Sequence, residues 1–147
     1  MANGLINSGL YSTNGSFKVK TAAVARGIFV KPDYTDMTCV VPGTDATKDV
    51  YMVDNHIDTP EELAIDDKDF VVKVGVFAEL RKLQLGCTFT TTALEAAIGT
   101  YAVGGVVMIS AIGKLKANVA GLFQATIKEV ITNYDGEAAL KCVVTAV

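Results

Sequence analysis

The sequence predicts a mainly β fold: a small β-barrel or sandwich with an extended N-terminal arm and at most one or two short helices. Two observations support this prediction. Runs rich in Val, Ile, Thr and aromatic residues recur along the chain, with turn signals roughly every ten residues. A good helix start occurs in one segment alone, with Thr59 as N-cap and Pro60 at the first position. The chain has 147 residues, enough for one domain with a substantial core.

Residues 1–16 are expected to form the arm, and residues 17–147 a single β-rich domain. Asn, Gly and Ser dominate the arm and leave its apolar side chains isolated. Ordering this segment costs about 15–30 kcal/mol of backbone entropy, whereas each buried apolar side chain contributes only about 1.5–3 kcal/mol. We therefore expect the arm to order on a neighbouring subunit; a frayed terminus without a role is the alternative. The expected interface residues of the arm are Leu5, Ile6, Leu10, Tyr11 and Phe17.

Strand-like runs follow one another from the arm to the C-terminus. Residues 70–85 fit two strands around Gly75, although residues 76–85 also fit a short helix. Residues 122–134 and 136–147 contain good helix formers, but their β-branched residues favour strands. The other expected strands lie within residues 17–25, 27–31, 37–43, 48–57, 86–94 and 106–112.

An uncharged run lies between Glu95 and Lys114, and its length raises the question of a membrane span. Glycines and β-branched residues interrupt any helical pattern in it, and no aromatic belt frames it. The run is better explained as a turn, a strand and a second turn, so no membrane contact is expected. The expected turn residues are Gly104, Gly105 and Gly113, because glycine adopts positive φ without steric cost.

The composition limits the possible partners. Half of the residues are apolar and a fifth are charged, so part of the apolar surface is expected to meet another protein. The net charge is −3 and the basic residues are scattered, which argues against nucleic acid as a partner. The N-terminus has no signal-peptide pattern, which indicates a cytosol-like compartment. Cys39, Cys87 and Cys142 match no metal-site spacing and are expected to be reduced and buried.

Few residues suggest catalysis or metal binding. The single histidine, His56, lies between Asp54 and Asp58, which places three possible metal ligands close together. Catalytic metal sites gather ligands from separated elements, so an ordinary surface histidine in an acidic turn is the simpler explanation. We therefore expect no catalytic, cofactor-binding or metal-binding residue and no enzymatic activity. An enzyme or metal-binding site built from His56, Asp54, Asp58 and a tyrosine is the alternative.

Three C-terminal segments resemble small capsid decoration (cement) and head-fibre proteins of tailed bacteriophages. The segments are GCTFTTTAL, YAVGGVVMISAIGKLKA and LFQATIKEVITNYDGEAALKCVVTAV, and the likeness covers residues 69–147. The residues that fill the glycine hairpin pattern of these proteins are Gly105, Val107, Ile109, Gly113, Lys114 and Leu115, and those that fill the later strands are Ile127, Val130, Val143 and Val144. The first 60 residues depart from this pattern.

The resemblance implies a virion structural protein that binds the major capsid protein on the head surface and stabilises the shell. It also implies a homo-oligomer, with a trimer favoured, that lies on the capsid surface of the virion and in the host cytoplasm during assembly. No cofactor is implied. Two further functions stay open: a fibre-base, neck or tail structural component, and a host-glycan-binding module.

Overall fold

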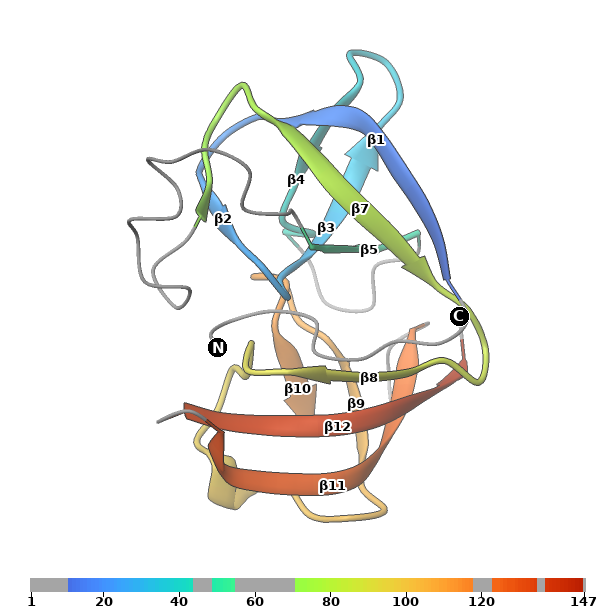
Figure 1. The fold of residues 1–147 in the computed structure, drawn as a ribbon, viewed down its shortest axis with the longest axis vertical. Coiled ribbons are helices and arrows are strands. Elements are labelled where there is room, and N and C mark those ends of the chain that lie inside the picture. Colours follow the sequence, from blue (N-terminus) through green and yellow to red (C-terminus); the bar gives the residue numbers. More distant parts are fainter. Residues whose placement is uncertain (1–10, 44–48, 55–70, 118–122, 135–136, 147) are drawn as a thin grey trace.

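The computed structural model describes residues 11–43, 49–54, 71–117, 123–134 and 137–146 (Figure 1). These residues form a mainly β protein, which confirms the predicted fold class. Within the described ranges the helical structure is limited to the short 3₁₀ helix η2 (Ile98–Thr100). The helix expected from Thr59 lies outside the described residues.

Five strands close into a barrel in the upper part of Figure 1. Around the barrel the order is β1-β4-β3-β5-β7, with β1 parallel to β4 and all other pairs antiparallel. Two short strands, β2 and β6, pair with each other beside it. The bounds are β1 (Tyr11–Val19), β2 (Val24–Ala25), β3 (Phe29–Asp33), β4 (Thr38–Val40), β5 (Tyr51–Val53), β6 (Val71–Val72) and β7 (Phe77–Leu83).

The barrel begins earlier in the chain than the sequence predicts. β1 pairs with β7 from its first residue, Tyr11, which lies opposite Leu83. The pairing continues to Lys18 opposite Phe77, with a register shift between Asn14 and Phe17. Residues 11–16 are therefore part of a barrel strand, and an arm can comprise residues 1–10 at most. The composition suggested a longer arm because Asn, Gly and Ser have low strand propensity, which backbone pairing with β7 overrides.

The C-terminal part forms a separate five-stranded sheet in the order β10-β9-β11-β12-β8, in the lower half of Figure 1. The long β11–β12 hairpin is its centre, and β8 and β9 pair with the hairpin's outer edges. The strands predicted within residues 86–94, 106–112, 122–134 and 136–147 are confirmed, whereas β10 lies where a turn was expected. The helical alternatives for residues 122–134 and 136–147 are wrong, as is that for residues 76–85, which supply β7 of the barrel. The bounds are β8 (Thr88–Thr91), β9 (Val106–Ile109), β10 (Leu115–Ala117), β11 (Gln124–Tyr134) and β12 (Glu137–Ala146).

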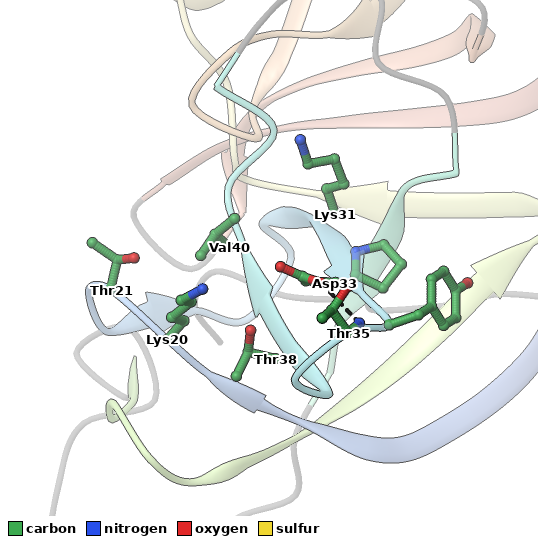
Figure 2. A pocket seen from close by; sticks show the side chains of 9 residues that line it. Lys20, Thr21, Lys31, Asp33, Thr35, Thr38 and Val40 are labelled. Atoms are coloured by element: carbon green, nitrogen blue, oxygen red, sulfur yellow. Dashed lines mark hydrogen bonds between the residues drawn. The ribbon is translucent and has the colours of Figure 1, made fainter.

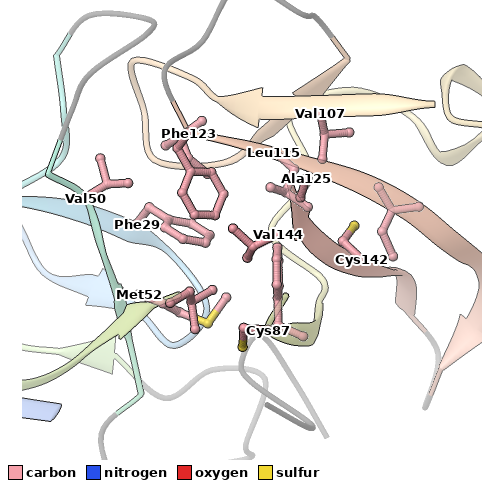
Figure 3. Close-up of a cluster of buried hydrophobic side chains, with 14 of the residues drawn as sticks. Phe29, Val50, Met52, Cys87, Val107, Leu115, Phe123, Ala125, Cys142 and Val144 are labelled. Atoms are coloured by element: carbon pink, nitrogen blue, oxygen red, sulfur yellow. The ribbon is translucent and has the colours of Figure 1, made fainter. Parts of the chain in front are cut away.

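Two apolar cores share strands of the barrel. Val30 and Val53 point into the barrel core with Phe17 and Leu80. The neighbouring residue Phe29 belongs instead to a second core, which combines barrel strands with the C-terminal sheet (Figure 3). The ring of Phe29 packs in a tilted or edge-on geometry against two rings of that region, at centroid distances of 5.4 Å to Phe123 and 6.1 Å to Phe89. Successive residues of a strand thus supply both cores.

The uncharged run before Lys114 folds as turns around β9. Gly104 and Gly113 have φ values of 85° and 80°, and Gly105 donates its N–H to the carbonyl of Ala102 at 2.9 Å. The second turn also touches the barrel, because the N–H of Phe29 donates to the carbonyl of Gly113 at 2.8 Å. Among the described residues, no helix has the length and apolar character needed to cross a membrane.

Candidate docking face

The outer surface of four barrel strands forms a continuous polar face. Lys18 of β1 and Lys20, the residue after its end, are exposed while Phe17 and Val19 of β1 are buried, as strand alternation requires. The strand register places Lys18 beside both Thr38 of β4 and Phe77 of β7. We name this surface the barrel face and define it by Lys18, Lys20, Lys31, Asp33, Thr38, Val40 and Phe77.

The barrel face contains a hollow of about 670 Å³. In Figure 2 its two lysines, Lys20 and Lys31, lie on either side of Val40, and Asp33 and Thr38 lie nearby on neighbouring strands. Cross-strand pairing explains this layout, because Lys31 is opposite Val40 and Asp33 is opposite Thr38. The complete lining is Lys20, Thr21, Lys31, Pro32, Asp33, Tyr34, Thr35, Thr38 and Val40.

One lysine of the hollow is neutralised within the chain. Lys20 Nζ lies 2.9 Å from Asp36 Oδ2, and Thr38 donates its hydroxyl to the other oxygen of the same carboxylate. The Thr38 and Lys20 hydrogen bonds lower the pKa of Asp36, and the hydrogen bond to Asp36 raises the pKa of Lys20. Lys31 is exposed and forms no ion pair with a carboxylate of the described residues. Its ammonium group is the one that an incoming anion would meet.

Tyr34 presents an exposed ring at the edge of the hollow. Its hydroxyl donates to Asp49 Oδ2 at 3.0 Å, and Asp49 is also paired with Lys82 at 2.9 Å. The ring packs edge-on against buried Phe17 with 5.4 Å between centroids, yet Tyr34 remains 60% exposed. Hydrogen bonding with Tyr51, followed by burial and the contact with Asp49, raises the pKa of Tyr34 well above its ordinary value. The phenol therefore stays neutral and its ring is held in position.

Apolar side chains continue the barrel face beyond β1. We name Val71, Val74, Val76 and Phe77 the apolar tip, and they are between 40% and 53% exposed. They flank Gly75, whose φ of 83° makes the tight turn before β7. Lys18 Nζ lies 5.0 Å from the centroid of the Phe77 ring, a cation–π distance. The barrel face thus joins lysines to an exposed aromatic ring.

The arm residues of the sequence prediction fall in three different places. Leu5, Ile6 and Leu10 lie outside the described residues, and Tyr11 begins β1. Phe17 is 0% exposed in the barrel core. The side chain of Phe17 is therefore committed to its own barrel and does not present an interface surface.

The possible metal ligands are not brought together as a site. His56 and Asp58 lie outside the described residues. Asp54 is buried, with its carboxylate 3.3 Å from Arg26 Nη2 and 2.8 Å from Arg81 Nη2. Both oxygens of Asp54 are therefore engaged by arginines. No group of three His, Cys, Asp or Glu residues in the described part of the chain could hold a metal ion.

The three cysteines are free and buried, as predicted. Cys39 lies in the barrel core, whereas Cys87 and Cys142 lie in the second core. Burial raises the pKa of Cys39 to about 11 and that of Cys142 to about 12. These two thiols therefore stay protonated at neutral pH, in keeping with a structural role.

The hollow and the apolar tip were not predicted from the sequence. The alternation of Phe17, Lys18, Val19 and Lys20 indicates an exposed basic stripe on one strand. It cannot indicate which strands lie beside it, because β1 pairs with β4 and β7 across long stretches of sequence.

No protein-family model, curated protein or solved structure matches this chain.

Proposed function

We propose that this protein is a virion structural protein that binds the major capsid protein on the outside of a bacteriophage head and stabilises the shell. The observation that supports it most is the apolar tip. A cluster of large apolar side chains exposed around one turn is typical of a protein-docking surface. The resemblance of residues 69–147 to decoration proteins suggests that the partner is a capsid shell, and that the working form is a homo-oligomer, with a trimer favoured.

Sedimentation with capsid shells tests this proposal. The shells are assembled from the major capsid protein encoded by the same genome, and the decoration protein is added at increasing concentration. We expect saturable co-sedimentation, and light scattering of the unbound protein is expected to give the mass of a trimer. A protein that stays in the supernatant at all concentrations would contradict the proposed function.

The contribution of an arm is tested separately by deleting residues 1–10. Deleting residues 1–16 would also remove the part of β1 that pairs with β7, so loss of binding would then have two explanations. We expect the shorter deletion to reduce shell binding and to leave the urea midpoint unchanged. Undiminished binding would show that the arm has no role, while the decoration function would stand.

A host-glycan-binding module is the second candidate, and the hollow favours it. Exposed Tyr34 lines the hollow together with Thr35, Thr38 and Asp33, and such a combination of an aromatic residue and hydrogen-bonding groups suits a sugar. A glycan array with the wild type and the Tyr34→Ala variant tests it. Hits that disappear in the variant would support glycan binding. An array without hits, together with tight shell binding, would exclude glycan binding and support the decoration function.

A further inference from the structure

We propose that the barrel face and the apolar tip together bind an acidic, apolar segment of the shell protein, with carboxylates on Lys31 and Lys18 and apolar side chains over Phe77 and Val76. This inference rests on the proposed function and specifies the chemistry of the partner.

Charge supports the acidic character of the partner. The whole chain has a net charge of −3, yet among the residues that define the barrel face three lysines, Lys18, Lys20 and Lys31, outnumber the one carboxylate, Asp33. Asp36 neutralises Lys20. Lys18 and Lys31 form no ion pair with a carboxylate of the described residues, so the barrel face has positive charge to offer on an otherwise acidic protein. Complementary charge steers association and selects among partners.

The apolar tip supports the apolar character of the same segment. Phe77 is 53% exposed and Val76 is 47% exposed, and Phe77 lies directly beside Lys18 in the strand register. Aromatic side chains that become buried on binding are frequent anchors of interfaces, with polar groups around them. A segment that alternates acidic and apolar residues would place its carboxylates and its apolar side chains on neighbouring parts of this surface.

The rigidity of the sheet that carries the binding groups also supports a docking role. Lys18 and Phe77 are fixed by adjacent strands, because β1 donates its Lys18 N–H to the Met37 carbonyl at 3.1 Å and pairs with β7 on its other side. The ammonium of Lys18 rests over the Phe77 ring. The binding groups therefore need little reorganisation, which lowers the cost of association.

Shell sedimentation of two double variants and two controls tests the inference. Lys18→Glu with Lys31→Glu reverses the charge of the barrel face, and Val76→Ser with Phe77→Ser removes the centre of the apolar tip. The charge control is Lys128→Glu, on the exposed surface of β11. The apolar control is Val103→Ser with Ile112→Ser, because both residues are exposed in other turns. The urea midpoint of each variant establishes that it is folded.

We expect each double variant to bind shells at least tenfold more weakly than the wild type, and each control to bind within twofold of it. Raising the salt concentration should weaken wild-type binding and have little effect on the lysine variant, since salt screens exposed charges over about 10 Å at 0.1 M and about 3 Å at 1 M. Wild-type binding without salt dependence, or tight binding by both double variants, would overturn the inference and leave the proposed function standing.

Two other outcomes identify a different occupant. If the double variants change the mass seen by light scattering while shell binding is unchanged, the surface joins copies of this chain and the inference is wrong. If the wild type itself fails to bind shells, the proposed function and this inference both fail.

Discussion

The two ends of the barrel wall differ in how much of their outer surface is covered by the C-terminal sheet. Phe29, Lys31 and Asp33 project from the same side of β3, yet Phe29 is buried against the sheet and Lys31 is exposed. β7 shows the same change, from exposed Phe77 at its start to buried Leu83 at its end. One end of the barrel wall is apolar because the sheet packs on it.

At the opposite end of the same strands, outward-facing side chains of the described residues are exposed, and they include the lysines and the apolar tip. The outward-facing side chains of the barrel strands therefore divide into two sets. Those near the C-terminal sheet contribute to stability, and those far from it are available for a partner. Mutations in the two sets should therefore affect different measurements.

The largest expected effect is at the contact between the two regions. Phe29→Ala removes a ring that packs against Phe89 and Phe123 and leaves a cavity in the second core. We expect it to lower the free energy of unfolding by about 4 kcal/mol. Val30→Ala, at the next position but inside the barrel, should lower it by about 2 kcal/mol. Urea unfolding measures both.

If Phe29→Ala lowers the free energy of unfolding no more than Val30→Ala does, the view that the second core joins the barrel to the C-terminal sheet is contradicted. If the wild type unfolds in a single transition and Phe29→Ala in two, the barrel and the sheet can unfold separately once this contact is weakened.

The elements of both regions were largely predictable from the sequence, because their information is local. β-branched runs ended by glycine turns indicated β7, β9, β11 and β12, and the glycine before β7 has the positive φ that marks a turn. What could not be predicted is which strands pair with one another. Tyr11 of β1 pairs with Leu83 of β7, 72 positions further along the chain, and no local pattern specifies such a neighbour. The barrel closure and the boundary of the arm depend on that pairing.

The second expected effect compares a buried carboxylate of the barrel with one on its surface. Asp54→Ala removes the buried carboxylate that the half-buried guanidinium groups of Arg26 and Arg81 share. We expect a loss of about 3 kcal/mol in the free energy of unfolding. Asp36→Ala removes the exposed partner of Lys20 and should cause no measurable loss. Thermal and urea unfolding of the two variants measure the difference.

The Asp36→Ala variant also separates an effect on shell binding from an effect on stability. Removing Asp36 releases the positive charge of Lys20 on the barrel face. If that surface binds carboxylates, Asp36→Ala should bind shells at least as well as the wild type, whereas Asp54→Ala should change binding only through its stability. Weaker binding by Asp36→Ala at an unchanged urea midpoint would contradict a basic docking face.

The candidate site was less predictable than the fold for a related reason. Asp54 appeared in the sequence as a neighbour of His56, and this local grouping suggested a metal site. The structure pairs it instead with Arg26 and Arg81, which are distant in sequence. Exposed Lys18 and Lys20 were visible as an alternating pattern, but their proximity to Lys31 and Phe77 depends on the order of the strands. Residue types could be predicted, but not their spatial grouping.

The smallest of these stability effects concerns two turn glycines with similar backbone conformations. Gly104 and Gly113 both have positive φ, so replacing either by alanine strains the backbone. A Cβ at Gly104 has no atom within 4 Å, whereas a Cβ at Gly113 would overlap the carbonyl oxygen of Phe29. We expect a loss of about 1 kcal/mol for Gly104→Ala and about 2 kcal/mol for Gly113→Ala, because the latter also displaces the turn from the barrel.

Hydrogen exchange separates the two contributions. The N–H of Phe29 donates to the carbonyl of Gly113, so Gly113→Ala should speed exchange at Phe29, and Gly104→Ala should not. Equal unfolding energies and equal exchange at Phe29 in both variants would mean that the turn does not hold the sheet against the barrel. The covered end of the barrel would then depend on the side-chain packing of the second core, in which Phe29 lies with Met52 and Leu83.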